Sequence, residues 1–369
     1  MKLYKCAKFS NKRTKDISID TYISTENMLP YKGGVTTAES LPDCQSAPKY
    51  EPHDILLSNI RPYFQKIWYA DRIGSCSNDV LILKPNGRVD SRFLYYVLSD
   101  KTFFDYDTLT SKGTKMPRGT KNAIMKYIVP DVTRPIQKKI ASILSAYDSL
   151  IENNTKRIRL LEQMAENLYK EWFVRFRFPC HENTEFVDGL PKDWKIKRYG
   201  EITKIVAGGD CPSVCSNTPI DDICIPIYSN GIINEGLYGY TDKERVNKPC
   251  ITISARGTIG YVCLRLFPFV PIVRLLAVVP QKISVYYLYH YSRYSNLEGN
   301  GTSQQQLTKP MLLKKKILVP TQTLLKRFDK IVESIYKEKR QLEELNKRLA
   351  RQRDLLLPRL MSGKLEVKA

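Results

Sequence analysis

Three cations lie close together in a loop rich in glycine and proline. The segment Lys112-Gly-Thr-Lys-Met-Pro-Arg118 contains Lys112, Lys115 and Arg118, and Lys121 follows it. Cationic side chains on such a loop neutralise phosphates, which is how most proteins grip a nucleic-acid backbone. The segment therefore predicts a phosphate-binding loop, and a solvated loop with no ligand is the competing interpretation.

A second loop offers amides and hydroxyls in place of cations. Glutamine amides read the edge of adenine, and hydroxyls bond to phosphates. We therefore predict that this loop also contacts a nucleic acid. Its sequence is Gly301-Thr-Ser-Gln-Gln-Gln306, and its candidate residues are Ser303, Gln304, Gln305 and Gln306.

Two arginines stand in equivalent places, each after a predicted strand. Arg61 ends the segment Asp54-Ile-Leu-Leu-Ser-Asn-Ile-Arg61, and Arg256 ends Cys250-Ile-Thr-Ile-Ser-Ala-Arg256. An arginine can bond to O6 and N7 of guanine with both arms of its guanidinium. Each can equally be a structural arginine. The recurrence of the same kinds of loop with different polar residues favours two reading surfaces on one scaffold.

These loops belong to an internal repeat. Residues 113–130 and 301–320 both run from a Gly-Thr loop through a Thr-Lys pair to a strand that ends in proline. The two prolines, Pro130 and Pro320, are 190 residues apart. A tyrosine-rich helical patch precedes each copy, at Phe93–Leu98 and Val285–Tyr291, and a long helix follows each copy. The repeat predicts one architecture used twice.

The two long helices have apolar positions at alternating spacings of three and four, which is typical of a coiled coil. Two such seams in one chain most simply pair with each other, antiparallel. Asn154 fixes the register of the pair or lies on a solvated edge. We expect Pro135 in the first turn of the first helix, and Pro358 to end the second. The first seam is Ile140, Leu144, Tyr147, Ile151, Asn154, Ile158, Leu161, Ala165, Leu168 and Trp172; the second is Phe328, Ile331, Ile335, Glu338, Leu342, Leu345, Leu349, Gln352 and Leu356.

The predicted fold class is α/β (α+β), with a pseudo-two-fold repeat. Two domains with twisted β-sheets are separated by two long helices that form an antiparallel coiled coil. At about 1.5 Å per residue, the first seam spans roughly 50 Å, so the helices are expected to act as a spacer. The expected segments are a first domain at 1–134, a central helix at 135–179, a second domain at 180–322 and a C-terminal helix at 323–369.

No catalytic centre is evident in the sequence. Gly363-Lys364 lacks the upstream glycine of a phosphate-binding loop, and no Asn-Pro-Pro or Asp-Pro-Pro element of a base methyltransferase occurs. The three histidines form no metal-spaced pair, and Cys211 and Cys215 are poorly spaced for zinc. We therefore predict a protein that is not an enzyme and holds no metal. An enzyme with an unrecognised site stays an alternative.

Charge and cysteine content indicate the setting. The chain of 369 residues has 59 Lys and Arg against 38 Asp and Glu, a net charge of +21, and all four expected segments are positive. Such an excess favours a polyanionic partner. Nine scattered cysteines, an odd number, are typical of a reducing cytoplasm. No apolar run is long enough to span a membrane, so we expect no membrane association.

With these residues in view, the chain resembles the specificity subunit of type I restriction-modification enzymes over essentially its whole length. Its helical regions resemble that family in Pro135-Ile-Gln-Lys-Lys-Ile140 to Leu168-Tyr-Lys-Glu-Trp-Phe-Val-Arg-Phe-Arg-Phe-Pro179, and in Arg353-Asp-Leu-Leu-Leu-Pro-Arg-Leu-Met-Ser-Gly363. Its recognition motifs resemble the family in Ile23-Ser-Thr-Glu-Asn-Met-Leu29, Leu57-Ser-Asn-Ile-Arg-Pro-Tyr63, Ile227-Tyr-Ser-Asn-Gly231 and Ile253-Ser-Ala-Arg-Gly-Thr-Ile-Gly260. These motifs add Asn59, Asn230 and Thr258 to the candidate DNA-binding residues.

The resemblance implies two target-recognition domains that read the halves of an asymmetric bipartite site in double-stranded DNA. It implies methyltransferase (M) and restriction (R) subunits as partners. S-adenosylmethionine, ATP and Mg then belong to those partners, and this chain has no cofactor. A coiled-coil assembly protein without a DNA role stays an alternative, as does a subunit whose partners are inactive. One departure is visible: Leu190-Pro-Lys-Asp-Trp194 opens the second domain and has no counterpart before Met1. Either an edge strand of the first domain is unpaired, or the natural start of the chain differs.

Overall fold

A computed structural model describes residues 1–295, 297 and 306–361. Among these residues the chain forms two compact units. Unit 1 comprises Met1–Thr155 and the chain from Glu343 onward, and unit 2 comprises Lys156–Leu342. Each unit therefore contains one globular domain and a part of each long helix.

Unit 1 is built on a four-stranded antiparallel sheet. Its elements before the long helix are η1 (Leu3–Lys5), β1 (Ala7–Phe9), β2 (Arg13–Thr14), β3 (Tyr22–Ile23), β4 (Ala47–Tyr50), β5 (Ile55–Ser58), η2 (Pro62–Phe64), β6 (Ile67–Tyr69), β7 (Gly74–Cys76), β8 (Val80–Pro85), α1 (Ser91–Ser99), α2 (Lys101–Leu109) and α3 (Lys121–Ile124). The main sheet has the order β1-β8-β5-β6, and a second sheet has the order β2-β4-β7-β3 with a parallel pair β3-β7.

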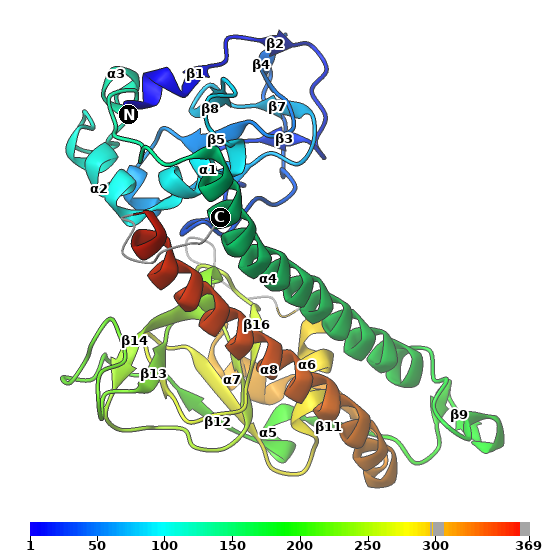
Figure 1. Ribbon diagram of the computed structural model, residues 1–369. Coiled ribbons are helices and arrows are strands. Elements are labelled where there is room, and N and C mark those ends of the chain that lie inside the picture. The colour runs from blue at the N-terminus through cyan, green and yellow to red at the C-terminus, as the bar shows by residue number, and fades with distance from the viewer. Residues whose placement is uncertain (296, 298–305, 362–369) are drawn as a thin grey trace. The chain divides into compact units, whose positions relative to one another are not determined.

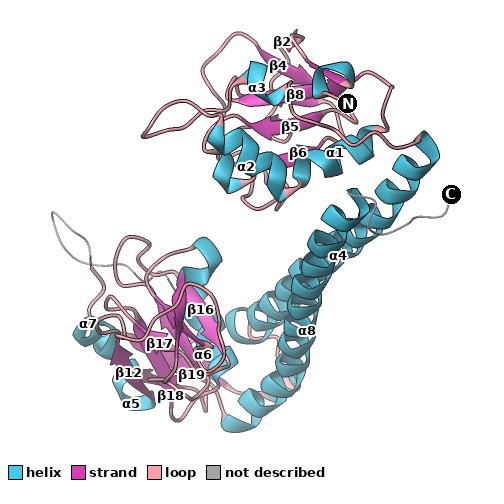
Figure 2. Ribbon diagram, turned by 60° about the vertical axis from the view of Figure 1, so that its left-hand side comes forward, coloured by secondary structure: helices cyan, strands magenta, loops and turns pink. Residues whose placement is uncertain are grey.

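The strands of the main sheet bury side chains on both faces. In β5, Ile55 and Leu57 pack with α1 and α2, while Leu56 packs with the second sheet. This alternation is the period-two geometry of a strand. The unit is therefore layered as helices, main sheet and second sheet, and Figure 2 shows α1 and α2 on one side of the main sheet.

Unit 2 repeats this plan. Its elements are η4 (His181–Asn183), β9 (Phe186–Val187), β10 (Leu190–Pro191), β11 (Lys195–Arg198), α5 (Tyr199–Ile202), β12 (Thr203–Ala207), β13 (Ile225–Tyr228), η5 (Ile233–Gly236), β14 (Leu237–Thr241), β15 (Cys250–Ile253), β16 (Val262–Arg265), β17 (Val270–Pro271), β18 (Leu276–Pro280), α6 (Val285–Tyr294), α7 (Lys309–Lys314) and β19 (Lys316–Val319). The main sheet has the order β12-β18-β15-β16, and β14-β13-β17 forms a smaller sheet.

The two main sheets have the same connectivity, which confirms the predicted repeat. In each, the strand before the arginine loop (β5 or β15) pairs with the next strand of the chain and with the strand that precedes a helix. That helix begins with a side-chain cap in both copies. The carboxylate of Asp90 accepts from the amides of Arg92 and Phe93, and the hydroxyl of Ser284 accepts from Tyr287.

The copies differ at one edge. In unit 2, β11 pairs with β19 over four residue pairs. In unit 1 the corresponding pairing is reduced to one bridge between Lys2 and Ile128. Here the terminal ammonium of Met1 donates to the carbonyl of Val129 at 2.5 Å, and the amide of Val129 donates to the carbonyl of Met1 at 2.7 Å.

The long helices are α4 (Arg134–Tyr169), continued by a π-helical turn η3 (Lys170–Val174), and α8 (Gln322–Met361) (Figure 1). In unit 1, Asn154 Nδ2 donates to Asn346 Oδ1 at 2.9 Å, and Asn154 is 6% exposed. In unit 2, the rings of Trp172 and Phe328 lie 6.0 Å apart. The antiparallel pairing is therefore confirmed within each unit, and the interpretation of Asn154 as a solvated edge is wrong.

Two predictions about α8 are wrong. Pro358 lies inside the helix, which continues to Met361. Proline removes one backbone hydrogen bond, but Leu357 and Leu360 are 3% and 2% exposed in the core of unit 1, and this burial holds the last turn. The residues of α8 that face the core also differ from the predicted second seam by one position at alternate sites. Ile331 and Leu345 are exposed, and their neighbours Val332 and Asn346 face the core and α4 instead.

All nine cysteines are free thiols. In the part of the chain that the structure describes, no helix is both long enough and apolar enough to cross a membrane. Within the same residues, no group of three or more potential ligands is arranged to hold a metal ion.

Candidate nucleic-acid interface

In unit 1 the arginine loop and the cationic loop join through their backbones. Arg61 N donates to the carbonyl of Pro117 at 2.8 Å, and Gly119 N donates to the carbonyl of Asn59 at 3.0 Å. Lys112 and Arg118 exchange two backbone hydrogen bonds of 2.9 Å, so the cationic loop is a closed hairpin. We call residues 59–61 and 112–119 the unit 1 loop pair; it brings together the predicted residues Asn59, Arg61, Lys112, Lys115 and Arg118.

The charged side chains of the loop pair differ in whether they form an ion pair within unit 1 or are exposed. Arg118 forms an ion pair with Asp79 at 3.2 Å. Lys112, Lys115 and Arg61 are exposed, and the guanidinium of Arg61 has no hydrogen bond or ion pair with any residue that the structure describes. Arg61 also has a left-handed backbone with φ of 51°, which is uncommon for a residue other than glycine and strains the backbone of this loop. Arg61 is thus the side chain best placed to take a ligand.

Lys121 lies apart from the loop pair. It begins α3, and its ammonium stands 5.6 Å from the centre of the Phe9 ring. Together with Lys12 and Arg13 it lines a separate pocket beside β1. The sequence analysis did not single out Lys12 or Arg13, because they precede every motif and lie in an ordinary run of polar residues.

In unit 2 the second loop returns onto Arg256. Leu307 N donates to the carbonyl of Ala255 at 3.0 Å, and Arg256 Nη2 donates to Gln306 Oε1 at 3.2 Å. The structure therefore places the candidate residues Arg256 and Gln306 together. Ser303, Gln304 and Gln305 lie outside the described residues.

Asn230 and Thr258 flank Arg256 in different ways. Asn230 Oδ1 accepts from the amide of Ala255 at 2.8 Å, and its Nδ2 donates to the carbonyl of Val273 at 2.7 Å. Asn230 thus braces the arginine loop against the loop after β17. The hydroxyl of Thr258 is buried, and it has no hydrogen-bond partner among the described residues. Of the two, only the Asn230 side chain is seen to hold the Arg256 loop.

Arg265 is a residue that the sequence analysis missed. Its side chain is 1% exposed, its Nη1 lies 2.6 Å from Glu235 Oε2, and its Nη2 donates to the Glu235 carbonyl. The guanidinium also lies over the Tyr228 ring, 3.6 Å from its centre. Glu235 has a φ of 54°, so Arg265 holds a strained turn next to Asn230. An arginine at the end of a strand gives no sign in sequence that it is buried.

A buried carboxyl lies under the unit 1 loop pair. Asp107 of α2 is 0% exposed, and burial raises the pKa of its carboxyl to about 7. Neither of its oxygens, nor Asn59 Oδ1, has a hydrogen-bond partner among the described residues. The sequence Lys101–Leu109 gave no signal of this, because Asp107 follows the pattern of a polar helix face.

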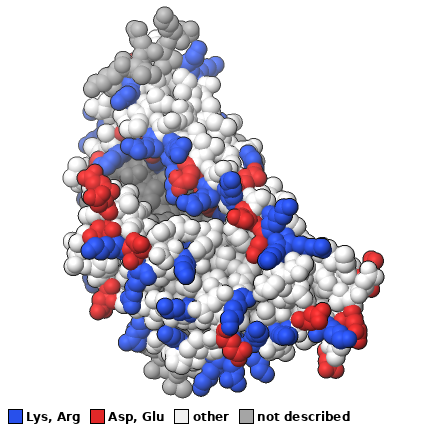
Figure 3. Space-filling view, turned by 90° about the horizontal axis from the view of Figure 1, so that it is seen from below, with Lys and Arg blue, Asp and Glu red and all other residues white. Residues whose placement is uncertain are grey.

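Surface charge by itself does not locate the interface. Figure 3 shows Lys and Arg side chains spread over one face of the molecule and interspersed with Asp and Glu. No single basic patch dominates that face. The matching loops around Arg61 and Arg256 therefore mark the candidate interface better than charge does.

Comparison with known proteins gives a consistent result. The model of the type I restriction modification DNA specificity domain matches residues 3–163 and again 191–347. The type I restriction enzyme MjaIX specificity subunit of Methanocaldococcus jannaschii is 29% identical over 308 residues, which cover 77% of this chain and 71% of that protein. The type I restriction enzyme HindI specificity subunit of Haemophilus influenzae is 24% identical, with 90% of each chain covered.

A solved structure supports the fold. The crystal structure of the type I restriction-modification system S subunit from M. genitalium superposes with a TM-score of 0.60 and 16% identity. The match covers 100% of this chain and 96% of that chain. At this identity the likeness concerns the architecture of two domains and two long helices.

Proposed function

Because the chain belongs to the type I restriction-modification DNA specificity family, whose members are non-catalytic subunits, we propose that unit 1 and unit 2 each read one half of a bipartite DNA site. The observation that carries the proposal is the recurrence of an arginine loop at the same place in two sheets of the same connectivity. Arg61 follows β5 and Arg256 follows β15, and a second loop docks on each.

The loops differ in the chemistry that they present. Around Arg61 the second loop supplies Lys112, Lys115 and Arg118, whereas around Arg256 it supplies Gln306. Different side chains on one scaffold are what two different half-sites require. We assign base reading to residues 1–134 and 180–322, and spacing of the two readers to residues 135–179 and 323–369.

The remaining roles follow from the family. The partners are double-stranded DNA, methyltransferase subunits that act on the bound site, and restriction subunits that act beyond it. S-adenosylmethionine, ATP and Mg serve those partners, and this chain contributes recognition alone. The complex works in the cytoplasm, where its DNA lies.

The first prediction concerns the two arginines. Arg256→Ala is expected to relax discrimination at one half-site by about 1–3 kcal/mol if the guanidinium holds a guanine, and Arg61→Ala is expected to do the same at the other. The measurement is the methylated motif of each variant, made with the methyltransferase partner. Equal relaxation of both halves by either variant would contradict the assignment.

Lys115→Ala is the matched control for Arg61→Ala, because Lys115 lies exposed on the same loop pair. A loop lysine is expected to bind a phosphate. Its loss should weaken all sequences alike and reduce the salt dependence of binding by nearly one phosphate contact. The motif itself should stay the same.

A second prediction concerns the spacing. One heptad inserted after Asn154, and one inserted before its partner Asn346, preserve the pairing of the helices. At about 1.5 Å per residue the insertion adds roughly 10 Å, or about three base pairs of 3.4 Å. The unread gap in the methylated motif should lengthen while both half-sites are kept, with some loss of affinity because one reader is rotated about the duplex. A motif with the original gap would refute the role of the helices as a spacer.

A further inference from the structure

The buried carboxyl of Asp107 faces other acceptors and no donor. Asp107 Oδ1 and Oδ2 and Asn59 Oδ1 are all buried, and all three lack a hydrogen-bond partner within residues 1–295, 297 and 306–361. A buried acceptor without a hydrogen-bond partner destabilises the folded chain, so three at one place need a physical explanation.

The three oxygens converge on Gly119. A Cβ on Gly119 would stand 2.5 Å from Asp107 Oδ1, 3.1 Å from Asp107 Oδ2 and 3.1 Å from Asn59 Oδ1. Glycine alone fits this place, and its amide donates to the Asn59 carbonyl at 3.0 Å. The side chains of Asp107 and Asn59 therefore lie against the same point of the loop pair. A proton on the Asp107 carboxyl would allow a hydrogen bond between the two side chains.

We propose that Asp107 is a protonated carboxylic acid that donates its hydrogen to Asn59 Oδ1 and thereby fixes the loop Asn59-Ile-Arg61 for DNA recognition. Asp107 is then a positioning residue, since it acts on Arg61 through Asn59. The inference rests on the proposed reading of a half-site by unit 1. It explains why a carboxyl is buried under a strained loop: when neutral, it supplies the donor that the amide oxygen lacks.

The surroundings favour the neutral acid. Burial raises the pKa of Asp107 to about 7, and no neighbouring charge opposes this. α2 packs against η2 and α1, and its Asp107 lies against Gly119 of the loop pair. The polar and charged groups of these elements form contacts with other residues or face solvent. Asp100 accepts from Thr102, Tyr96 donates to Asp148, Tyr106 donates to the Ala123 carbonyl, and Arg118 pairs with Asp79. The exposed groups are Arg61, Tyr63, Lys112 and Lys115.

The pKa shift fixes the direction of the pH effect. The carboxyl is harder to ionise in the folded chain than in the unfolded chain, where its pKa is about 4. Its contribution to stability is therefore complete below about pH 4 and is lost as the pH rises to about 7. Above that pH an ionised carboxylate faces the Asn59 amide oxygen, and the Arg61 loop loses its donor.

The test compares the full chain with Asp107→Asn, which keeps a neutral donor at the same place. Unfolding by denaturant is followed between pH 5 and pH 9 for both proteins. The ratio of their unfolding constants should change by up to about tenfold per pH unit between pH 5 and pH 7, and then level off. The matched control is Asp105→Asn, on the same helix, whose carboxylate is 54% exposed and pairs with Lys101; its ratio should stay flat over this range.

A second readout separates positioning from simple stability. In the assembled methyltransferase complex, discrimination at the half-site read by Arg61 should fall as the pH rises from 6 to 8, while discrimination at the half-site read by Arg256 stays constant. Asp107→Asn should remove this difference. Asn59→Ala should lower discrimination at the first half-site at every pH, because the acceptor is lost.

The outcomes are distinct. A flat ratio of unfolding constants would overturn the protonated acid, whatever the DNA result. A sloping ratio with pH-independent discrimination at both half-sites would overturn the positioning role. If the complex showed no bipartite motif, the proposed function would fail, and the unfolding measurement would still decide the state of Asp107.

Discussion

Exchanging residues 180–322 for the corresponding segment of another family member is expected to change one half of the methylated motif completely and to leave the other half unaltered. The physical reason is that the two readers do not share a core. The main sheet of unit 1 buries its side chains in two clusters of its own, and the main sheet of unit 2 does the same. The exchanged sheet and its loops should therefore carry the DNA-binding surface of the donor protein with them.

The measurement is methylome sequencing of cells that contain the exchanged chain and the methyltransferase partner. The reciprocal exchange of residues 1–134 should change only the other half. Exchange of residues 135–179 between members with equal helix lengths is the control, and it should leave both halves as they were. Joint alteration of both halves by either domain exchange would show that recognition does not divide between the units.

The architecture was predictable because its signals are long or repeated. The first seam extends over ten positions of α4 and η3, and all of them are buried or half-buried in the structure. The repeat predicted two domains of one plan, and the two main sheets share their connectivity. Periodicity and repetition average over many residues, so single exceptions do not hide them.

The predicted second seam is wrong at some positions because a polar pair between the helices, and not the apolar spacing, decides which residue of α8 faces α4. Leu345 continues the apolar spacing, but the structure turns Asn346 inward to meet Asn154. The apolar spacing favours leucine over asparagine at a core position. That the opposite helix carries an amide at the same height is visible only in the structure. The register of α8 is set by such polar partners.

The candidate DNA-binding arginines were predictable from their residue type and their position after a strand. The buried residues that position their loops were not predictable. Arg61 and Arg256 follow strands in a repeated motif, which sequence can show. Arg265 and Asp107 act through burial, and burial depends on partners that are distant in the chain, such as Glu235 for Arg265. No local pattern distinguishes them from the exposed arginines and aspartates that make up most of the charge.

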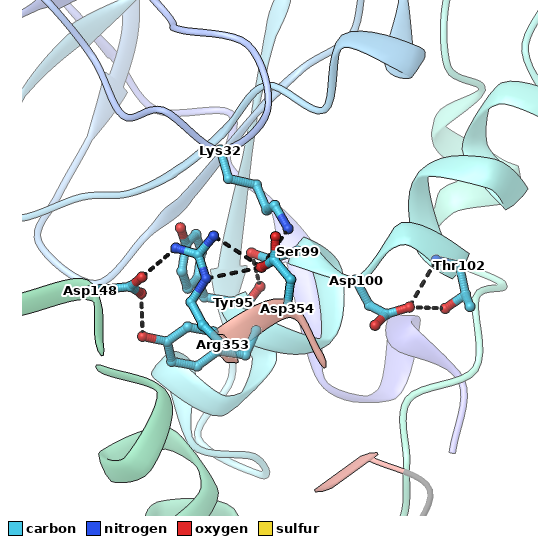
Figure 4. Close-up of polar contacts among 9 residues, drawn as sticks. Lys32, Tyr95, Ser99, Asp100, Thr102, Asp148, Arg353 and Asp354 are labelled. Carbon is cyan, nitrogen blue, oxygen red and sulfur yellow. Dashed lines mark hydrogen bonds and ion pairs between the residues drawn. The ribbon is translucent and has the colours of Figure 1, made fainter. Parts of the chain in front are cut away.

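Arg353→Ala is expected to destabilise unit 1 by about 3 kcal/mol, because it leaves a half-buried carboxylate without its cation. Arg353 Nη1 lies 2.6 Å from Asp148 Oδ1, and the Arg353 side chain is 13% exposed. Asp148 also accepts from the Tyr96 hydroxyl at 2.5 Å, so one carboxylate joins α1, α4 and α8. Figure 4 shows Arg353 between Asp148 and Asp354.

Unfolding by denaturant measures the effect, and the second acidic neighbour provides the control. Asp354 lies 3.0 Å from the Arg353 guanidinium, pairs with Lys32 and is 43% exposed, so Asp354→Asn is expected to cost about 0–1 kcal/mol. The double variant Asp148→Leu with Arg353→Leu removes both charges and should recover much of the loss from Arg353→Ala, because an apolar pair needs no buried counter-charge. If the double variant were as unstable as the sum of the single variants Asp148→Leu and Arg353→Leu, the two side chains would act independently. The ion pair would then not be what holds the end of α8 on unit 1.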